Sequence, residues 1–288
     1  MHADLDTLCT VVYCTAADLL PEARANARRK ITDAEVVTLC VAQAIMGIPS
    51  DRVFLATARK RLIHLFPQLP RQAGYFKRRR RLADAIEWLM GVFASASPGF
   101  LDDLLLVDST PLECGRSRET ATRSALGDVA GYGYCASHSR WFWGLRLHLL
   151  AAPDGTPRAL ELADPRRDER EVALELLARG ARGGELLVAD KGYAGRAFAA
   201  AAGGLGVLVV RPARADEEGD GPHLSQIRQR IESIFWSLKG TLTLERHGAR
   251  TLVGLRERML SRFLCLAACI SLNHRLGRPS RALVDYCA

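Results

Sequence analysis

Several common sequence signatures are missing from the 288 residues, and each absence removes a class of protein. No uncharged apolar run reaches about 18 residues, so we expect no membrane span. No N-terminal segment joins a basic start to an apolar stretch and a small-residue cleavage site, so we expect a cytoplasmic protein. The glycine-rich P-loop of nucleotide hydrolases and the G-x-S-x-G turn of serine hydrolases are also missing. We therefore expect neither a nucleotide cofactor nor a serine nucleophile.

The eight cysteines form no C-x-x-C pair, which argues against a zinc site built from such pairs. Several lie in apolar stretches, where a reduced cysteine packs as a small hydrophobe, so we expect reduced thiols. Hydrophobic residues make up 48% of the chain, which supports a packed core. Lysine and arginine outnumber aspartate and glutamate by 40 to 32, giving a net charge of +8. This excess favours a polyanionic partner such as DNA or RNA, although a soluble protein can also be basic without one.

Residues 1–98 are expected to form an all-helical DNA-binding region. Thr32 and Glu35 have the spacing of a capping box before an apolar helix, and Ser50 can cap a short one. Apolar residues at helical spacing predict a longer helix from about 76 to 96. Several short helices in a basic segment fit a helix-turn-helix type of domain. A helical bundle without DNA-binding function is the alternative.

An unbroken run of five cations is the most basic segment of this region. It follows Tyr75 and Phe76 and consists of Lys77, Arg78, Arg79, Arg80 and Arg81. Such a run suits contacts with phosphates, and the aromatic rings can support it or stack on bases. A solvated helix face is the alternative explanation.

After a linker at about 95–99, the pattern changes to apolar strands alternating with helices. Strand candidates include 104–107, 141–152, 158–162, 185–189 and 207–210, and a helix is expected over 225–239. We expect an α/β catalytic domain over 101–275, with a mixed sheet flanked by helices, and a C-terminal tail over 276–288.

Three carboxylates occupy positions where sheet enzymes place catalytic groups. Asp108 and Asp190 each follow an apolar strand candidate, and Glu232 lies within the helix over 225–239. Phosphodiester cleavage needs an activated oxygen nucleophile and a stabilised leaving oxygen, and two divalent ions can supply both. Mg²⁺, or alternatively Mn²⁺, prefers such oxygen ligands. We therefore expect Asp108, Asp190 and Glu232 to hold two ions; a turn residue or a solvated helix acid is the ordinary alternative for each.

The surroundings of the three acids resemble the DDE-type transposases of bacterial insertion sequences, in particular a compact subgroup. Val107-Asp108-Ser109-Thr110 resembles the first motif of that family, and Asp190-Lys191-Gly192-Tyr193 the second. Arg228, Glu232 and Lys239 have the spacing of the third, with Ser225 in place of the family's tyrosine. The resemblance implies an RNase H-like fold, strand cleavage at transposon ends and transfer of the 3′-hydroxyl into target DNA.

The resemblance also implies double-stranded DNA as the partner, both as terminal inverted repeats and as target. Arg228, Lys239 and Lys191 would then contact DNA, and a homodimer would join two transposon ends in the DNA complex. The segment after the first acid carries Arg116, Arg118 and Arg123, which can follow a DNA strand; an ordinary polar loop is the alternative.

Two segments are given structural interpretations. For the aromatic stretch with Tyr132, Tyr134, His138, Trp141 and Trp143, core packing is favoured over base stacking. His148 is expected to be a hydrogen-bonded structural histidine. An RNase H-like nuclease without strand transfer, or a non-catalytic DNA-binding derivative, remains the alternative for the whole chain.

Overall fold

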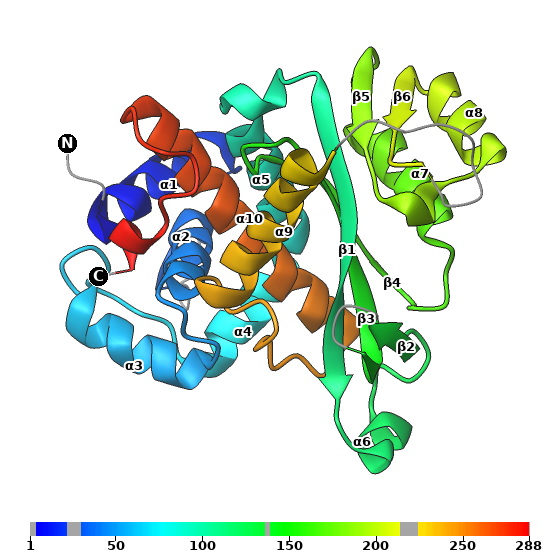
Figure 1. Cartoon of the computed structure of the whole chain (residues 1–288). Helices are drawn as coiled ribbons and strands as arrows, with labels where there is room; N and C mark the ends of the chain where they lie inside the picture. The colour runs from blue at the N-terminus through cyan, green and yellow to red at the C-terminus, as the bar shows by residue number, and fades with distance from the viewer. Residues whose placement is uncertain (1–3, 22–29, 136–138, 214–223, 288) are drawn as a thin grey trace. The chain divides into compact units, whose positions relative to one another are not determined.

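The computed structural model describes residues 4–21, 30–135, 139–213 and 224–287, and the chain forms two compact units (Figure 1). The first, here called the helical unit, comprises Met1–Ala96, Ser237–Ala249 and Val253–Ala288. The second, the sheet unit, comprises Ser97–Trp236 and Arg250–Leu252. Among the described residues, no helix has the length and hydropathy that crossing a bilayer requires.

The helical unit is built from helices, of which the first three start with a side-chain cap. Its elements are α1 (Leu5–Leu19), α2 (Asp33–Ile45), α3 (Asp51–Arg61), α4 (Gln72–Arg81), α5 (Ala83–Ser95), nearly all of α10 (Leu252–Arg275) and a short 3-10 helix, η4 (Val284–Tyr286). Thr32 and Glu35 form the predicted capping box at the start of α2, and the Ser50 hydroxyl accepts from the Val53 N–H at the start of α3. The helix predicted over 76–96 is instead divided into α4 and α5, because Leu82 leaves helical geometry.

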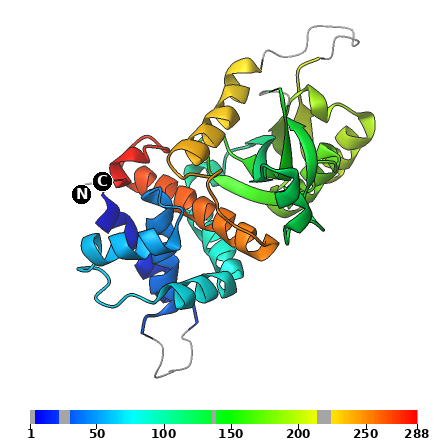
Figure 2. The ribbon, with the colours of Figure 1, turned by 90° about the horizontal axis from the view of Figure 1, so that it is seen from below.

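The core of the helical unit is formed around two helices that have no solvated face. All residues of α2 from Ala34 to Ile45 except Glu35 are buried, and so is α10 from Met259 to Asn273. A helix that is apolar on all sides must be surrounded by other elements. Figure 2 shows α10 lying among the N-terminal helices of this unit. Cys9, Cys40, Cys265 and Cys269 are free thiols in this core.

The sheet unit contains the six strands found in the described part of the chain. They are β1 (Leu104–Gly115), β2 (Gly131–Cys135), β3 (Arg140–Ala151), β4 (Pro157–Ala163), β5 (Glu185–Val188) and β6 (Val207–Val210). Its helices are α6 (Arg118–Arg123), α7 (Glu169–Gly180) and α8 (Arg196–Gly204), with short 3-10 helices η1 (Pro98–Phe100) and η3 (Lys191–Tyr193). The helix α9 (Ser225–Gly240) begins in the sheet unit and ends in the helical unit.

The sheet is mixed, with the strand order β2-β3-β1-β5-β6. β3 pairs antiparallel with β1 along one edge and with β2 and then β4 along the other. The pairs β1–β5 and β5–β6 are parallel, so these three strands have their carboxyl ends at the same edge. α7 and α8 lie beside β5 and β6 (Figure 1), and they bury Leu176, Phe198 and Ala202 in a core with Leu105 and Leu187. The predicted α/β class, with a mixed sheet flanked by helices and with N-terminal helices, is confirmed.

The two compact units divide the chain differently from the predicted domains. The expected boundary near residues 98–101 coincides with the passage from the helical to the sheet unit, whereas residues 253–275 belong to the helical unit. The reason is that α10 is buried on all sides from Met259 to Asn273, so it needs other helices around it. The functional domain boundaries stay a prediction.

Candidate active site

Asp108 lies within β1, where the partners of that strand change. The predicted strand ended at Val107, but β1 continues to Gly115 because its later residues pair antiparallel with β3. On its other edge, β1 pairs with β5 only as far as Leu106 and Val188. Asp108 therefore lies just beyond the end of the parallel ladder, and its carboxylate accepts the Ser109 N–H at 2.7 Å.

Asp190 lies at the corresponding place after β5. Its carboxylate accepts the Gly192 N–H at 2.6 Å, and so caps the short helix η3. A Cβ at position 192 would lie 2.9 Å from that carboxylate, so a side chain there would displace the carboxylate from the position that it has here. The motif Asp190-Lys191-Gly192 thus has a local structural reason: the glycine holds the carboxylate at the end of the strand.

Asp108 and Asp190 share one end of the sheet and influence each other electrostatically. Leu106 and Val188 are direct neighbours across the parallel ladder, and each acid follows its strand residue by two positions. The pKa of Asp108 is raised from 3.8 to about 7: burial is the main cause, the Asp190 and Glu169 carboxylates also raise it, and the Ser109 N–H and Arg228 lower it. Among the described residues, neither aspartate forms an ion pair. Like charges are therefore held together without a direct ion pair, although Arg228 is near enough to Asp108 to offset part of the repulsion.

Glu169, the first residue of α7, is an acid of this cluster that the sequence analysis did not identify. Its carboxylate accepts from the Ser109 hydroxyl at 3.2 Å and pairs with Arg146 on β3. The Arg146 guanidinium also donates to the Ser109 hydroxyl at 3.1 Å. Glu169 and Arg146 thus hold the side chain of Ser109, whose backbone N–H donates to the Asp108 carboxylate. No sequence spacing links positions 109, 146 and 169, so only the folded sheet brings them together.

Tyr193 places a phenol beside the same acids. The side chain is buried, and its hydroxyl has no hydrogen-bond partner among the described residues. Burial raises the pKa of Tyr193 well above its ordinary value, and Glu169, Asp108 and Asp190 raise it further. A buried hydroxyl without a partner is costly, and such groups are concentrated at functional sites. The hydroxyl is neutral and able to donate a hydrogen bond towards this cluster.

Glu232 lies on α9, exposed to solvent, and no contact with Asp108 or Asp190 is present in the structure. One turn earlier on that helix, Arg228 is close enough to Asp108 to lower its pKa. Lys239 is half-buried and pairs with Glu245 at 3.1 Å, while Lys191 is exposed on η3. The structure thus brings together Asp108, Asp190 and Arg228 from the predicted set.

The carboxylate oxygens of this cluster suit a divalent cation, but they supply only part of a metal site. Carboxylate oxygens are the ligands that Mg²⁺ and Mn²⁺ prefer, and a cation would offset the repulsion between Asp108 and Asp190. Within the described residues, however, no group of three or more acidic, histidine or cysteine side chains is close enough to hold an ion. A complete site therefore requires Glu232, or another ligand, to approach the two aspartates.

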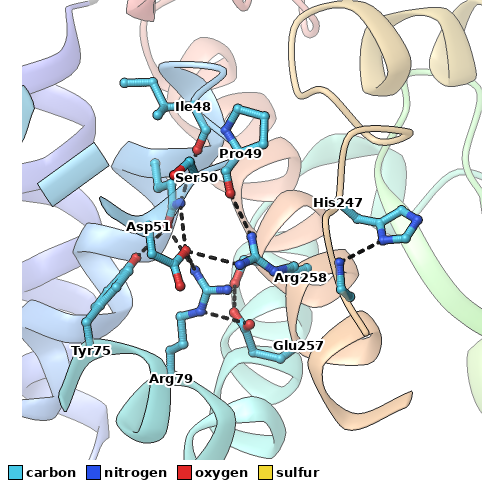
Figure 3. Close-up of polar contacts among 12 residues, drawn as sticks. Ile48, Pro49, Ser50, Asp51, Tyr75, Arg79, His247, Glu257 and Arg258 are labelled. Atoms are coloured by element: carbon cyan, nitrogen blue, oxygen red, sulfur yellow. Dashed lines mark hydrogen bonds and ion pairs between the residues drawn. The ribbon is translucent and has the colours of Figure 1, made fainter. Parts of the chain in front are cut away.

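The predicted basic run is divided by the fold, because α4 packs one of its sides into the helical unit. Arg79 is only 3% exposed, and its guanidinium lies 2.9 Å from both the Asp51 and the Glu257 carboxylate (Figure 3). Asp51 also pairs with Arg258 at 3.2 Å. The prediction that Arg79 contacts DNA is therefore corrected: its charge is used inside the protein, and no phosphate can reach it.

The other four cations of the run lie closer to solvent. Arg78 is half-buried and pairs with Asp33, and the Arg80 guanidinium lies 5.2 Å from the centre of the Phe76 ring. Lys77 and Arg81 are exposed. Tyr75 is buried, and its hydroxyl donates to Gln43 at 2.9 Å, so it is a core residue.

The arginines after the first acid lie partly on a short helix rather than wholly in a loop. Arg116 follows β1, and Arg118 and Arg123 are on the short helix α6. All three are exposed; Arg116 pairs with Glu113 at 3.6 Å and Arg123 with Glu119 at 3.1 Å. Exposed pairs of this kind contribute little to stability, so these guanidiniums can exchange their partners for phosphates at low cost.

The two structural interpretations are both corrected. Trp143 is buried as expected, but Tyr132, Tyr134 and Trp141 are 52%, 45% and 69% exposed. His138 lies outside the described residues. His148 is buried, and neither ring nitrogen has a hydrogen-bond partner among the described residues. Burial, together with Arg146 and Arg167, lowers the pKa of His148 to about 4, so the ring is neutral near pH 7.

Comparison with known proteins identifies the family. A family model described as "Transposase DDE domain" matches residues 99–268, which is more than half of the chain and includes Asp108, Asp190 and Glu232. Searches of curated proteins and of solved structures gave no match. Transposases of this family act on DNA and generally use divalent metal ions, and this chain belongs to the DDE transposase family.

Proposed function

We propose that the chain is the transposase of an insertion sequence, which cleaves DNA at the transposon ends and transfers the 3′-hydroxyl into target DNA. The observation that carries the proposal is the placement of Asp108 and Asp190 at one end of adjacent parallel strands, within the matched family domain. The terminal inverted repeats and the target are the double-stranded DNA partners. A homodimer in the DNA complex and a cytoplasmic location are part of the same proposal.

In this proposal, Asp108, Asp190 and Glu232 hold two Mg²⁺ or Mn²⁺ ions. When bound, the ions activate the attacking oxygen and stabilise the leaving oxygen. The chain prepares the ligands: the Ser109 and Gly192 N–H groups orient the two aspartates, and Glu169 with Arg146 fixes Ser109. Glu232 completes the set when the first half of α9 moves towards β1, and Arg228 is already near Asp108.

The proposed DNA contacts use cations on exposed or half-buried positions. Arg228 can bind a phosphate beside the aspartates with its forked donors, and Lys191 is next to Asp190. Lys239 must release Glu245 to contact DNA. Further phosphate contacts are assigned to Lys77, Arg78, Arg80 and Arg81 of α4 and to Arg116, Arg118 and Arg123. Residues 1–98, without Arg79, supply the helical DNA-binding region.

The test is cleavage of DNA that carries the transposon-end sequence, with Mg²⁺ or Mn²⁺. Wild type should nick this DNA, and Asp108→Asn should lose the activity by a factor of about 10³ or more, since a metal ligand is lost. Asp103→Asn is the matched control, because Asp103 is exposed and lies five positions earlier on the chain. Equal cleavage by wild type and Asp108→Asn would refute the assignment.

Strand transfer is tested separately, by incubating cleaved ends with a supercoiled target plasmid. Joined products support the transposase. Cleavage without joined products would instead favour a nuclease of the same fold. Specific binding with neither reaction would favour a DNA-binding derivative.

A further inference from the structure

The hairpin of β2 and β3 in the sheet unit has its large and small residues on unexpected sides. Along β2, Gly131, Gly133 and Cys135 are buried, whereas Tyr132 and Tyr134 point to solvent. A strand that covers a core normally has the opposite arrangement, with large apolar residues inside. A local rule broken in this way is expected at functional or strained sites.

Close packing behind the hairpin explains why the small residues are inside. A Cβ at position 133 would lie 2.5 Å from Pro165 and 2.8 Å from the Phe142 ring, and one at 131 would lie 2.7 Å from the Asp164 carboxylate. Position 133 has no room for a side chain, and a side chain at 131 would have to displace the Asp164 carboxylate. Strand alternation then directs both tyrosines outwards.

The exposed rings form one continuous surface, here called the aromatic platform, which consists of Tyr132, Tyr134 and Trp141. Tyr134 and Trp141 are opposite each other across the β2–β3 ladder, with ring centres 5.5 Å apart and planes tilted by 59°. Tyr132 lies two residues along the same strand face, opposite Trp143. Three large rings exposed together are unusual on a protein surface unless they bind a partner.

The platform is on the same face of the sheet as Asp108. Asp108 is in register with Leu149 of β3, and residues 141, 143 and 149 alternate onto one face of that strand. Tyr132 and Tyr134 share this face because they are opposite Trp143 and Trp141. Between Asp108 and the platform this face is covered, because Leu145, Leu147 and Leu149 are buried, so the platform is a separate exposed surface of the sheet unit.

The charges around the platform suit a nucleic acid. Gly115 is in register with Trp143, so Arg116 leaves the sheet beside the hairpin. Arg118 and Arg123 on α6 follow, and Arg140 begins β3 next to Trp141. All four arginines are exposed, against the three acids Glu113, Glu119 and Asp128, so the surface has a small positive charge. Glu113 and Glu119 already face arginines.

We infer that the aromatic platform binds unpaired nucleobases of the DNA substrate, by stacking. Bases in a duplex are stacked on each other, whereas unpaired bases offer free π-faces to aromatic rings. The flanking arginines would contact the phosphates between them. This inference rests on the proposed function, because it assigns the platform to the same DNA substrate.

The experiment compares two probes in EDTA: an oligothymidylate and an abasic oligonucleotide with the same number of phosphates. Affinities are measured by fluorescence anisotropy for wild type, the double variant Tyr134→Leu/Trp141→Leu and the control Trp88→Leu. Trp88 is also 51% exposed but lies on α5 of the helical unit. Because all replaced rings are exposed, the variants should fold, and circular dichroism checks this.

We expect wild type and Trp88→Leu to prefer the base-bearing probe. The double variant should bind that probe at least about 5-fold more weakly per lost ring, with unchanged affinity for the abasic probe. Trp141→Phe should retain the preference. Absence of a preference in wild type, or its retention in the double variant, would overturn the inference.

A second readout separates nucleobases from a protein partner. If the double variant changes the sedimentation of the protein but not its base preference, the platform is a protein interface and the inference fails. Since these measurements use no divalent ion, they do not depend on cleavage. Failure of the proposed function would appear only as absent metal-dependent cleavage, with the base preference intact.

Discussion

Two clusters of charged side chains, one in each compact unit, differ in how their charge is balanced. In the helical unit, Arg79 lies between Asp51 and Glu257, so a buried cation has anions on two sides. In the sheet unit, Asp108 and Asp190 lie together, and no described residue forms an ion pair with either. In the first cluster the charges are paired within the protein, so it has a structural role. In the second, Arg228 offsets only part of the repulsion, because the pKa of Asp108 is still raised. A cation from solution would relieve the rest, which is typical of a functional site.

Breaking the balanced cluster should have the largest effect on stability. Arg79→Met keeps most of the side-chain volume but leaves Glu257, which is fully buried, without its cation. We expect the free energy of unfolding to fall by about 3–5 kcal/mol, measured by urea denaturation. Arg81→Met, on the exposed side of the same helix, should change it by less than about 0.5 kcal/mol. Equal effects of the two variants would show that Arg79 is not a structural residue.

Removing a charge from the cluster of Asp108 and Asp190 should instead increase the free energy of unfolding. The pKa of Asp108 is about 7 in the folded protein and near 3.8 in the unfolded chain, so the folded state binds the proton more tightly. Stability therefore falls as the pH rises from about 4 to 7, and the loss is complete above 7. In EDTA at pH 8, Asp108→Asn should stabilise the protein by about 1–3 kcal/mol, and by progressively less towards pH 4.

Thermal unfolding across this pH range measures the effect. Asp103→Asn serves as the control, because that side chain is 84% exposed and its replacement should leave stability unchanged at every pH. A destabilised Asp108→Asn protein at pH 8 would contradict the unbalanced charge of this cluster.

The exposed cations of α4 should affect DNA binding rather than stability, which separates them from Arg79. Replacing Lys77 and Arg81 with alanine should reduce the slope of log affinity against log salt by about 0.9 for each lost phosphate contact. The equally exposed pair Lys60 and Arg61 on α3 is the matched control. An unchanged slope for the Lys77/Arg81 variant would remove α4 from the proposed DNA surface.

Local patterns were sufficient for some of these features. The capping box of Thr32 and Glu35 needs only residues three positions apart, and the apolar strands before Asp108 and Asp190 are visible in the sequence. The burial of Arg79 beside an acid was not predictable, because Glu257 lies far along the chain and only packing brings the two residues together. The exposure of Tyr132 and Tyr134 was not predictable either. It follows from the contact of Gly133 with Pro165, which leaves no room for a side chain at position 133, and these two residues are distant in sequence.

The central proposal is that Asp108, Asp190 and Glu232 act as one metal-holding unit, although Glu232 is exposed and has no contact with the aspartates in this structure. The most direct measurement is Mn²⁺-dependent cleavage of transposon-end DNA by Glu232→Gln, beside Asp108→Asn, Asp190→Asn and the control Glu245→Gln. We predict that Glu232→Gln loses as much activity as either aspartate variant and that Glu245→Gln retains it. Cleavage by Glu232→Gln at the wild-type rate would contradict the proposal.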